Sequence, residues 1–228
     1  GLAALGLGPL REPTLGVTMA GVLASRDLAF LHPVARVIGG PQVRNMGTVV
    51  GNLCNASPSA DNAPTLMAMA ATVDITGPSG SRSMPLDQFF QGPGVTALKN
   101  GEIVTAVRVP APAAGSGTAY HSLSQRGKLD CSAVGVGTMT VLNGDRCTDA
   151  RIIVGACAPV PMRTQAAEKM LMGKRMTDTL IRQAAEQASK ETSPITDVRA
   201  SAPYRWKMVA VLTIRALTDA RKMARRKQ

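Results

Sequence analysis

The segment "GTVVGNLCNASPSADNAP", residues 47–64, decides how the first half of this chain is interpreted. It holds two glycines, three asparagines, two serines, one acid and two prolines, without helical or strand periodicity. Bare backbone N–H groups beside short polar side chains bind phosphate oxygens, and a carboxylate such as Asp61 accepts hydrogen bonds from ribose hydroxyls. Because the segment matches neither GxGxxG nor a P-loop, two interpretations stay open: a nucleotide-binding segment or a long irregular surface loop.

The composition is that of an ordinary globular protein. The chain has 228 residues, of which 45% are hydrophobic and 18% charged, enough for one large or two modest domains. No apolar run approaches the roughly 20 residues of a membrane helix, and the opening residues lack the pattern of a signal peptide. The four cysteines lack metal-ligand spacing, so we expect reduced thiols, no metal site and a cytoplasmic location.

The positive charge is concentrated at the end of the chain. The net charge is +11, and residues 199–228 contain nine Lys or Arg against one acid, Asp219. Apolar residues recur there at helical spacing, which predicts a helix over 204–223 with a solvated basic face. A nucleic-acid-binding module is the alternative that such charge raises, but no aromatic platform or known motif accompanies it. We therefore expect no nucleic-acid partner.

The pattern of residues 1–110 predicts one α+β domain. Helical spacing runs through residues 15–38 and is interrupted at Pro33, and a short apolar helix follows the polar segment at 63–71. Alternating residues around a Gly/Pro/Ser turn predict a hairpin over 72–86, and 101–110 predicts a further strand.

Residues 111–117, "APAAGSG", form a Pro/Ala/Gly-rich linker before a second predicted domain at 118–228. Three strand-like runs come first, and an Asn-Gly pair at 143–144 predicts a tight hairpin between the last two. Helical runs follow, one with Thr177 as its N-cap. The second domain is therefore predicted as an α+β unit with an antiparallel sheet backed by helices. The predicted strands and helices cover residues 118–125, 132–142, 150–158, 164–174, 177–190 and 204–223.

Several motifs together resemble one family. "IGGPQVRNMGTVVGNLCNASPSADNAPTLMAMAATVDI" (38–75), "QRGKLDCSAVGVG" (125–137) and "SPITDVRASAPYRWKMVAVL" (193–212) resemble the FAD-binding subunit of the molybdenum hydroxylases. That family includes xanthine dehydrogenase, carbon monoxide dehydrogenase and 4-hydroxybenzoyl-CoA reductase. The resemblance implies FAD as cofactor, a molybdopterin-containing large subunit and a small subunit with two [2Fe–2S] clusters as partners. It also implies electron relay through the flavin to NAD+, oxygen or another acceptor, with no catalytic residue and no metal ligand in this chain.

The resemblance also implies which residues bind the cofactor. Thr48–Asn52 match the family's second flavin-binding segment, and Asp61 matches an acid that contacts the adenosine part. Ile38 and Val104 match apolar positions against the flavin, while Gly47 and Ser57 lie beside these contacts. The predicted cofactor-binding residues are Ile38, Gly47, Thr48, Val49, Val50, Gly51, Asn52, Ser57, Asp61 and Val104.

Two departures from the family qualify this prediction. Val50 stands where relatives usually carry a second glycine. If that position needs a positive φ, valine fits it poorly. Val50→Gly should then preserve or improve cofactor retention. Nothing in the chain matches the family's first pyrophosphate-binding loop, so we expect an N-terminally incomplete FAD domain. The alternative function is a truncated scaffold subunit that docks on its partners without flavin.

Overall fold

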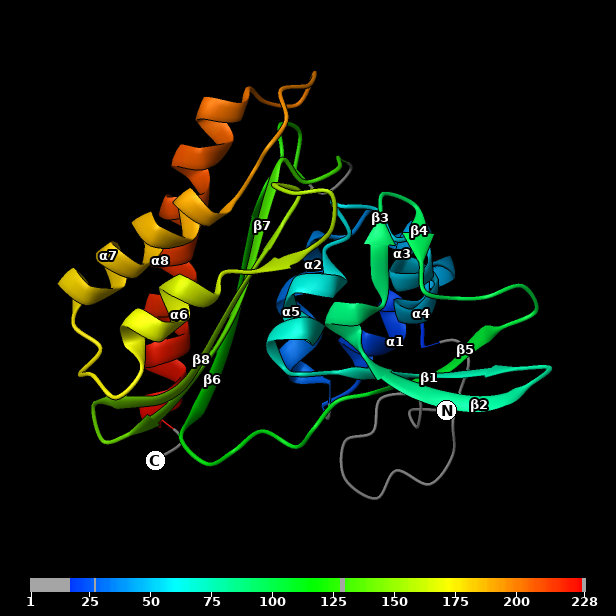
Figure 1. Ribbon diagram of the computed structural model, residues 1–228, viewed down its shortest axis with the longest axis horizontal. Coiled ribbons are helices and arrows are strands. Elements are labelled where there is room, and N and C mark those ends of the chain that lie inside the picture. Colours follow the sequence, from blue (N-terminus) through cyan, green and yellow to red (C-terminus); the bar gives the residue numbers. More distant parts are fainter. Residues whose placement is uncertain (1–16, 27, 128–129, 227–228) are drawn as a thin grey trace.

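The computed structural model describes residues 17–26, 28–127 and 130–226. Figure 1 shows a four-stranded sheet with helices on both faces, beside a smaller three-stranded sheet. This arrangement confirms the predicted α+β class. The predictions made for residues 1–16 lie outside the described residues, and no helix in the described part of the chain is long and apolar enough to cross a membrane.

Short helices fill the first part of the described chain. Thr18 caps the first of them by accepting a hydrogen bond from the Gly21 amide at 3.0 Å. Pro33 lies in the first turn of α2, where the backbone N–H that proline lacks would have no partner within the helix. It therefore stands at the start of a helix, where the sequence predicted an interruption. Gly39 has a φ of +53°, which turns the chain between α2 and α3. These elements are α1 (Met19–Ala24), η1 (Ala29–Leu31), α2 (His32–Val37) and α3 (Pro41–Met46).

The polar segment 47–64 contains more regular structure than its composition indicates. Residues Val49–Cys54 form α4, and Asn62–Ala68 form α5, with only residues 55–61 between them. The absence of periodicity in this segment was therefore misleading, whereas the predicted apolar helix after it is confirmed. All seven residues of α5 are buried, so this helix is part of the core.

The predicted hairpin and the strand after it form the first sheet. Its order is β2-β1-β5, and both pairings are antiparallel. A two-stranded ribbon, β3-β4, follows the hairpin and was not predicted. The strands are β1 (Thr72–Gly77), β2 (Gly80–Pro85), β3 (Phe90–Gly92), β4 (Val95–Thr96) and β5 (Ile103–Arg108), with the short helix η2 (Leu86–Gln88) before β3.

The second sheet is antiparallel in the order β6-β7-β8-β9, as the sequence predicted for its first three strands. β7 and β8 are joined through the Asn-Gly pair, and Gly144 has the positive φ of +57° that such a turn requires. β6 begins at Ser116, inside the predicted linker 111–117. The strands are β6 (Ser116–Leu123), β7 (Val134–Asn143), β8 (Arg146–Gly155) and β9 (Met162–Arg163).

Three helices cover one face of this sheet (Figure 1). They are α6 (Gln165–Leu171), α7 (Asp178–Glu191) and α8 (Ala202–Arg226). The predicted cap at Thr177 is confirmed, because its side chain accepts from the Leu180 amide at 3.1 Å. The predicted basic face of the last helix has two exceptions: the Arg205 side chain is only 2% exposed, and the Arg221 side chain 12%.

The other face of the second sheet packs against the first unit through α5. Strand residues alternate between the faces, so Ile152 and Val154 pack on the helices while Ile153 joins the core of the first unit. Gly137 permits this approach, since a Cβ there would lie 2.6 Å from the Pro64 carbonyl carbon. The two halves of the chain therefore share a core, and α5 is the element that joins them.

Candidate functional site

The predicted site begins where α1 and α4 start side by side. The Met19 amide donates to the Gly47 carbonyl at 2.9 Å, and the Val49 amide donates to the Val17 carbonyl at 3.0 Å. These two bonds fix Thr48 at the N-cap of α4. The site is thus held by backbone contacts between segments about 30 residues apart.

Within α4, the cap uses amides that a nucleotide-binding loop would leave open. Thr48 Oγ1 accepts from the Gly51 amide at 2.9 Å, and the Thr48 carbonyl accepts from the Asn52 amide at 3.1 Å. A Cβ at position 51 would lie 2.8 Å from Thr48 Oγ1, which explains why glycine is needed there. The Thr48 side chain therefore caps α4 through the Gly51 amide, and the amides of Gly51 and Asn52 both have partners within the chain.

The structure removes the objection to Val50. This residue lies inside α4, and it is absent from the non-glycine residues with a positive φ, which are Ala56, Ala70 and Ala156. Its partly buried side chain packs against the core of the first unit. Glycine at this position would lower the helix propensity by a few tenths of a kcal/mol and would remove the packing of the Val50 side chain. We therefore expect Val50→Gly to lower the midpoint of thermal unfolding and not to improve FAD retention, and a raised midpoint would contradict the helical role.

Asn52 lies opposite the start of α5. Its Oδ1 accepts from Asn62 Nδ2 at 3.1 Å, and the Asn62 side chain is 1% exposed. No described residue pairs with the Nδ2 group of Asn52, whose side chain is partly exposed. Asn52 therefore links α4 to α5 and keeps one donor available for a ligand.

Asp61 immediately precedes α5 and contacts the second sheet. Its Oδ1 accepts hydrogen bonds from Tyr120 Oη on β6 and from Ser132 Oγ, the latter at 2.7 Å. Burial raises the pKa of the Asp61 carboxyl above its ordinary value, while the hydrogen bonds from Tyr120 and Ser132 act in the opposite direction. No described residue donates to Oδ2. One oxygen thus joins the two halves of the chain, and the other is available to a ligand.

The other predicted residues, Ile38, Val104 and Ser57, lie in different surroundings. Ile38 ends α2, partly buried, against the same hydrophobic core that contains Val104. Val104 lies in β5 opposite Ile75 and is only 4% exposed, so most of its side chain contacts the protein. Ser57 shares a hydrogen bond of 3.0 Å with Ser59 Oγ and lines a separate cavity described below.

Sequence reasoning missed the partners of Asp61. Tyr120 and Ser132 lie 59 and 71 residues away, and neither belongs to a motif that spacing alone identifies. The one sequence feature that indicated a close contact there was the glycine pattern "VGVG" of β7, which leaves room for α5. A Cβ on Gly135 would meet Tyr120 Oη at 2.7 Å.

Both histidines have hydrogen-bond partners among the described residues. His32 Nε2 hydrogen-bonds the Ser25 carbonyl at 2.8 Å, and His121 pairs with Asp219 at 3.0 Å, so each has a local structural partner. No group of three His, Cys, Asp or Glu side chains that could hold a metal ion occurs in the described part of the chain.

These groups fit part of a dinucleotide. Asp61 Oδ2 and Asn52 Nδ2 supply an acceptor and a donor beside the joint between α4 and α5. A ribose with two hydroxyl groups needs such an acceptor.

Two family descriptions match the chain. Residues 15–112 match the FAD binding domain in molybdopterin dehydrogenase, and residues 119–220 match the CO dehydrogenase flavoprotein C-terminal domain.

Individual relatives agree with this assignment. The chain is 35% identical to the glyceraldehyde dehydrogenase medium chain of Sulfolobus acidocaldarius, over 86% of this chain and 69% of the relative. It is 32% identical to the carbon monoxide dehydrogenase medium chain of Afipia carboxidovorans, over 91% and 73%. The solved structure of reconstituted CO dehydrogenase from Oligotropha carboxidovorans superposes with a TM-score of 0.86 at 30% identity, covering 90% of this chain and 73% of that one.

Proposed function

The chain belongs to the family of FAD-binding medium subunits of the molybdenum hydroxylases, and we propose that it passes electrons through its flavin to a soluble acceptor such as NAD+ or oxygen. The electrons arrive from [2Fe–2S] clusters of a small partner subunit. A large partner subunit carrying molybdopterin performs the reaction with the substrate.

The proposal that this chain binds FAD depends mainly on Asp61. It is a partly buried carboxylate beside the Thr48-capped helix, with one oxygen bound to Tyr120 and Ser132 and one oxygen without a partner among the described residues. A lone acceptor in a partly buried position is costly unless a ligand or water supplies a donor. A hydroxyl of the FAD ribose supplies that donor.

The role of this chain toward the flavin is binding and orientation. When bound, FAD accepts electrons singly or in pairs, which lets it connect one-electron clusters to a two-electron acceptor. Thr48, Gly51 and the backbone of Val17–Met19 fix the start of α4, while Asn52 and Asp61 present polar atoms to the cofactor. Ile38 offers an apolar surface to the ring system.

A non-flavinylated scaffold that only docks on its partners is the second candidate. Among the described residues its support is that the amides of Gly51 and Asn52 are occupied within α4. The visible absorbance of the protein purified together with its partner subunits separates the two. The proposed function predicts about one FAD per chain, bleached when the molybdenum subunit's substrate is added; a colourless chain would support the scaffold.

A further inference from the structure

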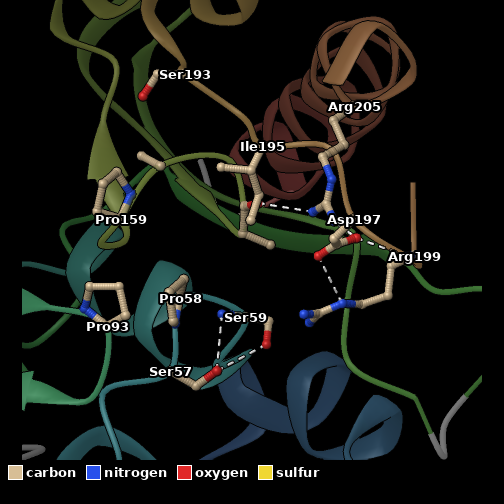
Figure 2. Close-up of a pocket in the computed structure, with 12 residues that line it drawn as sticks. Ser57, Pro58, Ser59, Pro93, Pro159, Ser193, Ile195, Asp197, Arg199 and Arg205 are labelled. Carbon is tan, nitrogen blue, oxygen red and sulfur yellow. Dashed lines mark hydrogen bonds and ion pairs between the residues drawn. The ribbon is translucent and has the colours of Figure 1, made fainter. Parts of the chain in front are cut away.

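A cavity of about 290 Å³ lies between the two halves of the chain, on the Ser57 side of the segment that leads to α5. Figure 2 shows its walls: Ser57, Pro58, Ser59 and Pro93 from the first unit face Pro159, Ile195 and Arg199 from the second. Since liquid water occupies about 30 Å³ per molecule, the space equals about ten waters. It is large enough for a small organic molecule.

The walls of this cavity are fixed by hydrogen bonds from three separate segments. The Ala156 amide donates to the Pro58 carbonyl at 2.7 Å, and the Gly94 amide donates to the Ala56 carbonyl at 3.0 Å. The Ser193 amide donates to the Cys157 carbonyl at 2.9 Å. Because these bonds connect separate segments, the cavity is preorganised, and binding a ligand costs little entropy for ordering its walls.

The charged groups in the wall leave a positive excess. Asp197 accepts from the buried Arg205 at 2.6 Å and from Arg199 Nε at 3.2 Å, so one carboxylate faces two guanidinium groups. Arg205 is further satisfied by the carbonyls of Ala133 and Ala156, at 2.5 and 3.1 Å. No described residue pairs with the two terminal nitrogens of Arg199.

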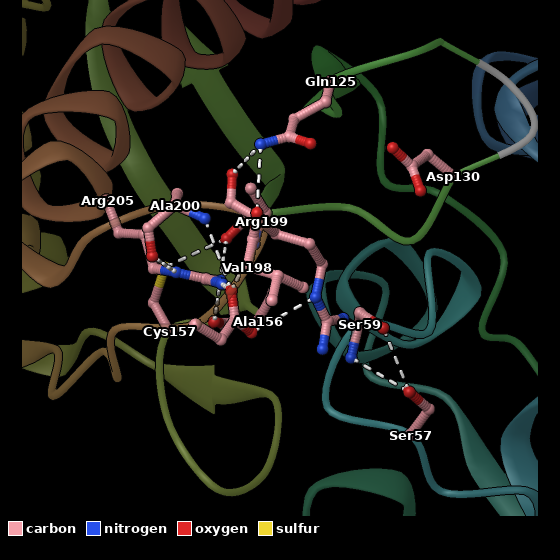
Figure 3. Close-up of polar contacts among 12 residues, drawn as sticks. Ser57, Ser59, Gln125, Asp130, Ala156, Cys157, Val198, Arg199, Ala200 and Arg205 are labelled. Carbon is pink, nitrogen blue, oxygen red and sulfur yellow. Dashed lines mark hydrogen bonds and ion pairs between the residues drawn. The ribbon is translucent and has the colours of Figure 1, made fainter.

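The guanidinium of Arg199 points toward Ser59, and the Ser57 and Ser59 hydroxyls lie together on the opposite wall (Figure 3). Gln125 Nε2 donates a hydrogen bond to the Arg199 carbonyl at 2.8 Å, which fixes the backbone at Arg199. Asp130 is the other nearby acid; Arg126 pairs with it at 3.0 Å, and Arg199 contributes a weaker electrostatic interaction. Guanidinium and hydroxyl donors facing one space are the groups that bind a phosphate.

We propose that this cavity binds a small organic phosphate, with the phosphate between Arg199 and Ser57/Ser59 and an apolar body against the proline side. Pro93, Pro159 and Ile195 line that side, and it contains no charged group. The occupant joins residues 57–59 to the second unit, four residues or fewer from Asp61. Binding therefore stabilises the arrangement of the two halves that places Asp61 against Tyr120.

Phenyl phosphate is a suitable probe, titrated by calorimetry into the purified holo-protein at constant ionic strength. We expect saturable binding of one molecule per chain and a raised unfolding temperature. Inorganic phosphate, which lacks the apolar body, and phenol, which lacks the charge, should each bind at least about fivefold more weakly, since each loses one half of the contacts.

Arg199→Gln should weaken phenyl phosphate binding by roughly tenfold or more, because it removes the charge-assisted bonds. Arg175→Gln is the matched control: it removes an equal charge from another Arg–Asp pair, Arg175 with Asp145. It should change the affinity less than about twofold. Absence of saturable binding, or equal affinities in the two variants, would overturn the proposal. The flavin spectrum, recorded on the same samples, reports the proposed function separately.

Discussion

Asp197→Ala is expected to lower the free energy of unfolding by about 3–5 kcal/mol, because it leaves a buried guanidinium without its counter-charge. Arg205 is 2% exposed and is the largest of the fully buried side chains. Its Nη2 donates to Asp197 Oδ1 at 2.6 Å, and Asp197 also accepts from the Arg199 amide at 2.8 Å. The pair fixes residues 197–205 at the start of α8, so urea unfolding of the variant should show a strongly lowered midpoint.

A pair between α7 and α8 whose carboxylate is exposed provides the control. Asp178 accepts from Arg221 at 2.7 Å, but the Asp178 side chain is 69% exposed. Asp178→Ala should therefore lower the urea midpoint much less than Asp197→Ala does, because an exposed carboxylate is screened by solvent. Combining Asp197→Ala with Arg205→Met removes both charges and should recover at least half of the loss. Equal effects of the two single variants would show that the buried pair contributes no special stability.

The same pair predicts a pH dependence. Burial alone would raise the pKa of Asp197, but the Arg199 amide and the Arg205 guanidinium together hold this pKa below its ordinary value of 3.8. The stability that Asp197 contributes is thus present above that ordinary value and is lost as the pH falls through the lowered pKa. The difference between wild type and Asp197→Ala should shrink below about pH 4.

Gly117→Ala is expected to cost about 3 kcal/mol or more, since the added methyl group meets rigid backbone. A Cβ at this position in β6 would lie 2.0 Å from the Ala220 carbonyl oxygen and 2.6 Å from the Ala224 amide nitrogen. Both atoms belong to α8, so the helix and the sheet would have to separate. Overpacking of this kind usually costs about 1–3 kcal/mol, and no flexible side chain is available here to relieve it.

Gly92→Ala is the matched control for this effect. The nearest atom to a Cβ on Gly92 is Val95 Cβ at 3.9 Å, an ordinary contact, and Gly92 has no positive φ. We expect a change within about 0.5 kcal/mol in the free energy of unfolding. If Gly117→Ala unfolded at the same urea concentration as Gly92→Ala, the close packing of α8 on β6 would be wrong.

Local sequence patterns predicted the second sheet and its helices well. The Asn-Gly pair lies at the β7–β8 turn, and Thr177 caps α7, because both features depend on residues adjacent in sequence. The alternation in residues 72–86 likewise predicted the β1–β2 hairpin.

The helix α4 could not be predicted in this way. Val49, Val50, Gly51 and Asn52 all have low helix propensity, and the helix depends on the Thr48 cap and on packing against the core. Tertiary contacts thus override the local preference of these residues.

Long-range polar contacts were equally inaccessible to local patterns. Arg205 looked like one more basic residue of an exposed helix face, yet its guanidinium reaches the carbonyl of Ala133, 72 residues away. Asp61 was singled out as an acceptor for ribose hydroxyls and again through the family resemblance, but its bonds to Tyr120 and Ser132 depend on how the two halves of the chain meet.

The most direct test of the proposed FAD site is a flavin titration of Asp61→Asn beside Asp61→Ala. Asparagine keeps an oxygen for Tyr120 and Ser132 but replaces the second oxygen by an NH₂ group. We expect Asp61→Asn to retain most of the wild-type stability and yet to weaken FAD binding by about 1–3 kcal/mol, whereas Asp61→Ala loses both. If Asp61→Asn bound FAD as tightly as the wild type, Asp61 would be only a joint between the two halves, and the assignment of this segment to the cofactor would be wrong.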